Sequence, residues 1–314
     1  MTTVTPTTDT PAPATSLQGV VRLDDWGVIA AQGEDAASFL HGQLTQDLLL
    51  QRADEARLVA YCNPKGRMLF TAIAVQRDGQ ILLCAPRERI APTVKRLAMF
   101  VLRAKVRLAD ASEQWALWGA AGDAVPAALP SPWWAVWRDG ERLWVRLPAG
   151  AGVSRALLVQ PADLAAPAGG ALDPAHWRWL DVMSGVAHVT DPVVEAFVPQ
   201  MLNYESVGGV NFKKGCYPGQ EVVARSQFRG TLKRRAYIAH AAAEVAVGAE
   251  VFNTADLEQP CGTVVQVAPA PGGGFDTIVS LQISAAQAGS LQVGAAGGVA
   301  LSLQPLPYPL LEDI

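Results

Sequence analysis

The most informative segment of this 314-residue chain is FVPQMLNYESVGGVNFKKGCYPGQEVVARSQFRG, residues 197–230, where polar functional groups are densest. Its centre, KKGCYPGQE, places two lysines and a cysteine among glycines and a proline, directly before EVVARSQF, which can form a helix. Pro218 suits the first position of that helix. Glu221 would then lie in the first turn, where its charge complements the helix dipole. The segment therefore predicts a tight turn that leads into a helix.

Cys216 is the candidate reactive group of this segment. The expected helix would direct its positive end toward the thiol, and Lys213 and Lys214 precede it, which favours the nucleophilic thiolate. A small residue buried in a tight turn is the alternative interpretation. No sequence feature pairs Cys216 with a histidine, so we do not expect a papain-like nucleophile. No two Cys or His residues have the short spacing of a zinc site, and we predict no metal site.

The residues upstream of this segment predict helices and strands in alternation. Apolar residues at helical spacing predict helices in GEDAASFLHGQL (33–44) and in PRERIAPTVKRLAMFVLRA (86–104). The runs ARLVAYCN (56–63) and RMLFTAIAVQ (67–76) predict two strands around an NPKG turn. This mixture indicates an α+β unit.

Two similar hairpins raise the question of an internal repeat. Asp78-Gly79 predicts a type I′ turn, which needs positive φ at both central residues. VWRDGERLWV (136–145) resembles the VQRDGQILL of this hairpin (75–83). A duplicated α+β module and a chance similarity are both compatible with this pair. From about residue 231, short β-rich runs separated by Gly, Pro and Asp indicate a small antiparallel barrel or sandwich.

Composition limits the classes of protein that the chain can belong to. It is 50% hydrophobic, and its 25 basic and 29 acidic residues give a net charge of −4, which argues against a dedicated nucleic-acid binder. Residues 211–235 nevertheless carry seven basic side chains, Arg229 among them, and one acidic, a local balance of +6 that leaves −10 for the rest. A compact site for an anion or an acidic partner is therefore compatible with the total charge.

Cysteine spacing and hydropathy predict the compartment. The four cysteines are far apart and form no CxxC pair, which favours a reducing, cytoplasmic location. No apolar run approaches 18 residues, so we expect no membrane span. Residues 1–17, rich in Thr, Pro and Ala, are expected to be a disordered leader rather than a targeting peptide.

KGCYPGQE and its flanks resemble the signature of the YgfZ family of folate-binding proteins. SFLHGQLTQDL (38–48) and YCNPKGRML (61–69) match that family as well. These proteins are relatives of the glycine-cleavage T-protein and are implicated in iron-sulfur cluster assembly or repair. The resemblance implies two related α+β, ferredoxin-like domains and a C-terminal antiparallel β-barrel around a central folate cavity. We expect an N-terminal domain at 18–110, a middle domain at 111–230 and the barrel at 231–314, with the first two free to interleave.

The resemblance also implies the functional residues. Lys214 and Cys216 are the residues expected to be important for activity, beside a cavity for tetrahydrofolate or a one-carbon derivative. The expected folate-binding groups are carboxylates, amides and basic side chains near the matched segments: Gln43, Asn63, Lys65, Arg67, Asp181, Gln200, Asn203, Gln220, Glu221 and Arg225. Asp47 is a further candidate, although capping of the local backbone explains its presence equally well.

One departure from the T-protein bears on catalysis. True aminomethyltransferases carry an aspartate shortly after the asparagine of the NPKG-like segment, whereas here residues 67–75 contain no acidic residue before Asp78. Methylene transfer would lack the carboxylate expected to act as its general acid or base. We therefore expect an accessory protein in iron-sulfur cluster assembly or repair, a monomer whose partners are folate and iron-sulfur client or assembly proteins. A folate-dependent aminomethyltransferase and a tRNA-modification factor without an extended nucleic-acid surface are the alternatives, and whether a reaction is catalysed stays open.

Overall fold

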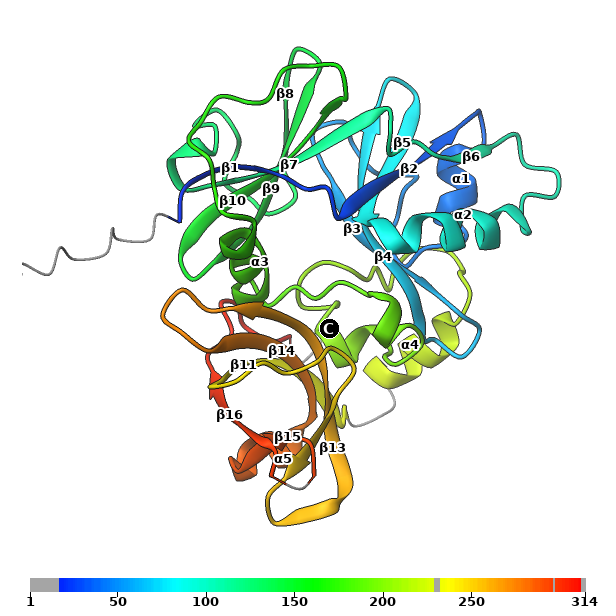
Figure 1. The fold of residues 1–314 in the computed structure, drawn as a ribbon. Helices are drawn as coiled ribbons and strands as arrows, with labels where there is room; N and C mark the ends of the chain where they lie inside the picture. The colour runs from blue at the N-terminus through cyan, green and yellow to red at the C-terminus, as the bar shows by residue number, and fades with distance from the viewer. Residues whose placement is uncertain (1–16, 229–231, 296, 312–314) are drawn as a thin grey trace, which may run out of the picture.

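The computed structural model describes residues 17–228, 232–295 and 297–311 (Figure 1). The expected leader, except for Leu17, and Arg229 lie outside these residues. Two five-stranded sheets and a closed barrel make up the fold, with two α+β units above the barrel in Figure 1. The predicted α+β fold class with a C-terminal antiparallel barrel is confirmed.

The first sheet has the order β3-β4-β5-β2-β6 and is antiparallel throughout. Its strands are β2 (Trp26–Gln32), β3 (Arg57–Cys62), β4 (Met68–Arg77), β5 (Gln80–Pro86) and β6 (Arg107–Asp110). Helices α1 (Ala36–His41) and α2 (Ile90–Ala98) pack against one face, where alternate residues of the strands join their apolar residues in one core. Both predicted helices are present but shorter than the segments that predicted them.

The second sheet has the order β1-β7-β10-β9-β8. Its strands are β1 (Gly19–Arg22), β7 (Trp115–Ala121), β8 (Val136–Asp139), β9 (Arg142–Gly150) and β10 (Val153–Pro161), and α3 (Pro174–Met183) follows β10. Strand β1 lies within the range expected for the N-terminal domain, yet it pairs with β7 of this sheet. The first strand of the chain therefore belongs to the second sheet, so the two units interleave.

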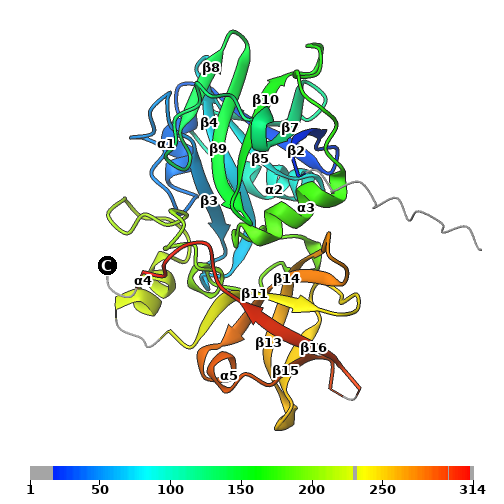
Figure 2. The same cartoon turned by 90° about the vertical axis from the view of Figure 1, so that its left-hand side faces the viewer.

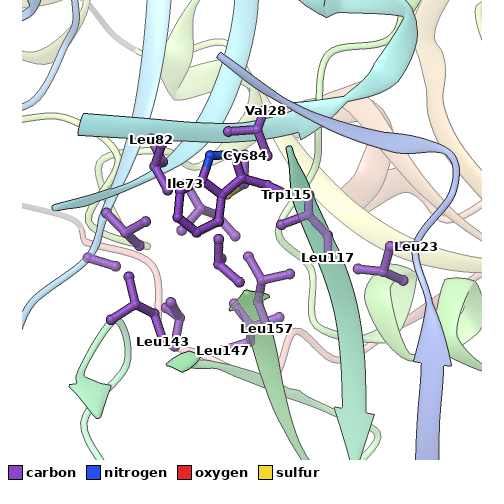
Figure 3. Close-up of a cluster of buried hydrophobic side chains, with 14 of the residues drawn as sticks. Leu23, Val28, Ile73, Leu82, Cys84, Trp115, Leu117, Leu143, Leu147 and Leu157 are labelled. Carbon is purple, nitrogen blue, oxygen red and sulfur yellow. The ribbon is translucent and has the colours of Figure 1, made fainter. Parts of the chain in front are cut away.

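The two sheets share one apolar core (Figure 3). Val28, Ile73 and Leu82 come from the inner face of the first sheet, and Leu117 and Leu157 come from the second. Full burial of each such side chain contributes about 1.5–3 kcal/mol. This shared core holds the two α+β units together above the barrel.

The barrel closes in the order β11-β14-β13-β12-β15-β16. Its strands are β11 (Arg234–Ala241), β12 (Glu250–Asn253), β13 (Asp256–Pro269), β14 (Phe275–Gln282), β15 (Leu291–Val293) and β16 (Val299–Gln304), with α5 (Ile283–Ala288) after β14. Helix α3 lies between the second sheet and the barrel in both views (Figures 1 and 2). The Trp179 indole N–H donates to Asp276 of β14 (2.6 Å), which ties α3 to the barrel.

Local turn chemistry agrees with the sequence at one hairpin and differs at the start of a helix. Asp78 (φ 49°) and Gly79 (φ 80°) both have positive φ, which confirms the predicted type I′ turn between β4 and β5. Helix α4 (Gln220–Phe228), however, begins two residues later than the proline-initiated helix predicted from Pro218. Gly219 has φ 81° and cannot continue a right-handed helix. Glu221 still lies in the first turn, as expected.

Candidate functional site

A cavity of about 630 Å³ opens where the three parts of the fold meet. The first α+β unit contributes Trp26 and Arg87, α3 contributes Arg178 and Asp181, and β13 of the barrel contributes Gln266. Its volume lies in the range of small-molecule sites. Because three structural units meet at this cavity, we take it as the candidate binding site.

Asp181 is the electrostatic centre of the cavity wall. Its carboxylate accepts hydrogen bonds from Arg155 (2.6 Å) and Gln266 (2.7 Å). Burial acts to raise the pKa of Asp181, but Arg155, His188 and the hydrogen bond from Gln266 outweigh it and lower the pKa below its usual value. The carboxylate is therefore ionised at neutral pH and paired with an arginine whose own side chain is 1% exposed and lies 4.4 Å from the Trp177 ring centroid.

Lys214 anchors the KGCY segment to the first α+β unit. Its ammonium donates to the backbone carbonyls of His41 (2.5 Å), the last residue of α1, and of Leu44 (2.9 Å), and lies 4.6 Å from the Tyr217 ring centroid. Burial lowers the pKa of Lys214 to about 8, while Asp47 and Cys216 act in the opposite direction. The lysine side chain therefore joins two segments that are 170 residues apart.

The other matched segments lie against the same region. Thr45 donates from its hydroxyl to the Gly209 carbonyl (2.7 Å), and Gln46 donates to the Gly208 carbonyl (2.7 Å). Gly219 packs so closely on the NPKG turn that a Cβ atom there would lie 2.4 Å from the Asn63 carbonyl oxygen. The three segments that carry the family resemblance therefore pack against one another, and we call their outer side the signature face: 38–48, 61–69 and 208–228.

Cys216 is exposed on the signature face, whereas Cys62, Cys84 and Cys261 are buried. His41 lies nearby: its Nε2 is 3.3 Å from the position that a Cβ atom would take at Gly215. The other ring nitrogen, Nδ1, lies 3.1 Å from Asp47, whose carboxylate also accepts the amides of Leu49 and Leu50 (3.0 Å each). No group of three or more side chains that could hold a metal occurs in the part of the chain that the structure describes.

The predicted folate-binding residues fall into three places. Asp181 alone lines the 630 Å³ cavity. Asn63 organises the NPKG turn by accepting the amides of Lys65 (2.9 Å) and Arg67 (3.0 Å), and Arg67 donates to the Ala196 carbonyl. The third place comprises the rest of the signature face, with Gln43, Gln220, Glu221 and Arg225, and the buried layer against α4 and β11, with Gln200 and Asn203.

Gln200 and Asn203 are completely buried and hold backbone. Gln200 donates to the Val223 carbonyl of α4 (2.7 Å). Asn203, in the left-handed region at φ 57°, bonds both the amide and the carbonyl of Ala236 in β11. These hydrogen bonds give both side-chain amides a structural role. Their role in folate binding stays a prediction.

The cavity contains functional groups that sequence reasoning missed. His188 lines it, with its ring edge-to-face against Trp26 at 4.8 Å between centroids. Arg155 and Gln266, the partners of Asp181, were missed as well. A buried carboxylate needs a cationic partner, which could have prompted a search for an arginine in the second unit. Neither His188 nor Gln266 belongs to a segment with any local signal.

Comparison with solved structures defines the class of fold. The chain is similar to the crystal structure of glycine cleavage system aminomethyltransferase T from Bartonella henselae, with a TM-score of 0.66 and 14% identity over 93% of this chain and 86% of that one. Two α+β units above a closed barrel are thus the aminomethyltransferase-like architecture. No family model matches the chain.

Curated relatives then define the family. The chain is 30% identical to the tRNA-modifying protein YgfZ of Serratia proteamaculans, over 94% of this chain and 93% of that protein. It is 31% identical to the tRNA-modifying protein YgfZ of Edwardsiella ictaluri, over 92% of each. The chain belongs to the YgfZ family. No helix of the described residues is long and apolar enough to cross a membrane.

Proposed function

We propose that this protein binds tetrahydrofolate, or a one-carbon derivative, in the 630 Å³ cavity and acts as an accessory protein in iron-sulfur cluster assembly or repair. The observation that carries the proposal is the cavity itself, lined by all three parts of the fold and centred on an ionised Asp181. Bound folate would supply a carrier for one-carbon units. The chain's own residues would bind and orient it.

The lining of the cavity fits a folate in several respects. Trp26 supplies an aromatic wall for the flat pterin, and Asp181 and His188 supply polar groups for its hydrogen-bonding edge. Arg87 and Arg178 are cations suited to the anionic glutamate tail. Three acids also line the cavity and would restrict the tail to the side of these arginines: Asp24, Asp25 and Glu88.

The signature face would serve the client protein. Cys216 is exposed there, and Lys214 holds its segment on the first α+β unit. The basic balance of residues 211–235 suits an acidic client. Cys216 does not line the cavity, so we assign folate binding to the cavity and partner contact to the face.

Aminomethyltransferase turnover is the first alternative, and the likeness in fold favours it. The acidic side chain expected after the NPKG turn is missing, however. Asp78 lies at the exposed tip of the β4–β5 hairpin, where it pairs with Arg138 (3.0 Å), and it does not line the cavity. Methylene-transfer assays with tetrahydrofolate separate the two functions, and robust turnover would favour the enzyme.

A role in tRNA modification is the second alternative, favoured by the name of the relatives. We propose that such a role is indirect, through an iron-sulfur enzyme that modifies tRNA. Steeply salt-dependent tRNA binding by the purified protein would favour direct contact, because each phosphate contact releases counterions.

The experiment that tests folate binding is a titration of purified protein with tetrahydrofolate and its one-carbon derivatives. Trp26 lies in the cavity wall, so we expect intrinsic tryptophan fluorescence to change on binding. Replacement of Trp26 by Phe is the matched control and should remove most of the signal while folate still raises the melting temperature. Absence of binding by every folate form would overturn the proposal.

A cellular experiment tests the thiol. Cys216→Ala should impair iron-sulfur enzyme activity in cells without unfolding the protein, because the side chain is exposed. Cys261→Ala, at a buried cysteine in the barrel, is the control and should leave that activity unchanged. Normal activity in the Cys216 variant would remove the thiol from the function.

A further inference from the structure

The loop between α2 and β6, residues 99–106, presents large apolar side chains to solvent. Met99 is 63% exposed, Phe100 46% and Leu102 86%. Figure 1 shows this loop at the outer edge of the first α+β unit, on the side away from the second sheet. The loop was expected to be helical, but α2 ends at Ala98. Neighbouring apolar side chains with this exposure form a patch, and such patches mark interaction sites.

Local packing fixes the outward direction of the patch. The Phe100 amide donates to the Leu97 carbonyl (3.0 Å). The Val101 amide donates to the Ala98 carbonyl (3.2 Å), so the backbone keeps turning past the end of α2. The Val101 side chain packs against the core between the helices and the first sheet. Because Val101 is held on the inner side, the exposure of Leu102 is built into the fold.

Basic side chains lie on both sides of the patch along the chain. Residues 95–107, KRLAMFVLRAKVR, contain five basic side chains and no acidic one. Lys105 pairs with Glu34 (2.8 Å). Lys95 and Arg103 are exposed and form no salt bridge within the described part of the chain. The segment is therefore apolar in its middle and positively charged at its two ends.

A cavity of about 280 Å³ adjoins the patch. Its lining places Arg89, Lys95 and Arg96 next to Met99, and no acidic side chain of the described residues lines it. Arg89 is already paired with Asp191 (2.6 Å), so Lys95 and Arg96 supply the free positive charge. The cavity therefore places a site for an anionic group beside the exposed apolar side chains.

We propose that residues 95–107 bind the surface of a membrane that contains anionic lipids. Phe100 and Leu102 would enter the boundary between headgroups and acyl chains, and the basic side chains around them would meet the lipid phosphates. The cavity at Lys95 and Arg96 would accept one of these phosphates. This inference goes beyond the proposed function and does not depend on folate binding.

The chemistry of the patch favours a lipid surface over other partners. Nucleic acids attract basic side chains, but their phosphate backbone offers nothing to bury aliphatic groups such as those of Met99 and Leu102. Stable protein interfaces bury about 800 Å² on each partner and are depleted of lysine at their centre. A short projecting loop with an apolar tip enters a lipid interface without needing a complementary groove.

The experiment measures co-sedimentation of the purified full-length protein with vesicles. One set of vesicles contains phosphatidylcholine alone, and the other contains phosphatidylcholine and phosphatidylglycerol in equal amounts. We expect the wild type to bind the mixed vesicles at least roughly tenfold more tightly than the neutral ones. Binding should weaken when salt is raised from about 0.1 M to about 0.5 M, because the charges are then screened.

Two variants test the two parts of the segment. Leu102→Ser removes an apolar side chain and should weaken binding to mixed vesicles roughly tenfold. Arg103→Gln removes one positive charge and should weaken it roughly fivefold. Leu257→Ser, at a 41% exposed leucine of the barrel, is the matched control and should bind as the wild type does. Circular dichroism and the melting temperature verify that each variant is folded.

The outcomes separate this inference from its rivals and from the proposed function. Equal binding to both sets of vesicles, absence of binding, or wild-type binding by folded Leu102→Ser would overturn it. If the protein binds tRNA but not vesicles, and Arg103→Gln weakens that binding, the segment contacts nucleic acid and the lipid inference fails. The folate titration is unaffected by any of these results, so failure here leaves the proposed function standing.

Discussion

The cavity and the signature face use charged groups in opposite ways. At the cavity wall, Asp181 forms an ion pair with the buried Arg155 behind it, and Nδ1 of His188 has no hydrogen-bond partner among the described residues. On the signature face, Lys214 is held by uncharged carbonyls and Cys216 is exposed beside it. We propose that the first region receives a ligand and that the second presents its exposed thiol to a partner.

Under the proposed function, this difference separates ligand binding from partner contact within one small fold. A wall whose central carboxylate is held by a buried ion pair favours selective binding of a compact molecule, because every unsatisfied group in it must be matched. An exposed thiol in a basic segment favours transient contact with another macromolecule. The comparison predicts that substitutions in the cavity wall change stability and ligand affinity, whereas those at Cys216 change function alone.

The largest effect is expected for Asp181→Ala. It leaves Arg155 as an uncompensated buried cation, which should lower the free energy of unfolding by about 3–5 kcal/mol. Asp173→Ala is the control at the start of the same helix, where the exposed carboxylate only caps the Ala175 amide, and it should cost about 1 kcal/mol. Urea denaturation at pH 7 measures both.

A pH series tests the same pair. The pKa of Asp181 is lowered in the folded state, so its stabilisation is complete above about pH 4 and is lost as the pH falls through the folded value. If Asp181→Ala and Asp173→Ala lower the free energy of unfolding equally at pH 7, the ion pair between Asp181 and Arg155 does not stabilise the cavity wall.

A smaller effect is expected where the signature face is assembled. Gly219 and Gly79 have nearly equal φ, 81° and 80°, but only Gly219 touches a neighbour, the Asn63 carbonyl. Alanine at Gly79 should cost about 1–2 kcal/mol for the left-handed backbone alone. Alanine at Gly219 should cost about 1–3 kcal/mol more, because the added methyl group overlaps the NPKG turn. Thermal unfolding of the two variants measures this difference, and equal costs would show that the segments are not interlocked.

Lys214→Met should lower the free energy of unfolding by about 1–3 kcal/mol, because it leaves the His41 and Leu44 carbonyls without their donor. Lys213→Met, at an exposed neighbour, should change the free energy of unfolding by less than about 0.5 kcal/mol.

The pH dependence of this lysine has a defined sign. Burial lowers its pKa to about 8, so above that pH the folded state binds fewer protons than the unfolded state. The contribution of Lys214 to stability should therefore rise between pH 8 and 10.5. Urea denaturation across this window should show the rise in the wild-type protein and not in Lys214→Met. A parallel rise in both would assign it to other groups.

Local sequence signals predicted many of the elements, because such signals act over a few residues, and the family resemblance identified the three segments of the signature face. Asp78-Gly79 dictated its hairpin, and the three matched segments do meet. The predicted start of α4 was wrong. Pro218 is a good first helical residue, but the packing of Gly219 against a turn about 155 residues away determines the backbone conformation there. A contact over that distance leaves no trace in a local pattern.

The cavity was less predictable for the same reason. Asp181 was identified, but its partners come from β10, β13 and the segment after α3, and each looks ordinary in its own sequence context. Gln200 and Asn203 drew attention as amides near the signature, yet their hydrogen bonds hold α4 and β11. Polar residue type indicates a candidate, and only the fold determines which polar groups already have partners.

The smallest effect on stability and the sharpest test of the comparison concern Cys216. Iodoacetamide should alkylate one thiol rapidly in the native protein and none in Cys216→Ser, because the other three are buried and burial raises the pKa of Cys62 and Cys84 to about 12. Mass spectrometry identifies the modified residue. Saturating tetrahydrofolate should raise the melting temperature but change the alkylation rate less than about twofold, since Cys216 does not line the cavity. Strong protection of the thiol by folate would mean that the cavity and the signature face act as one site.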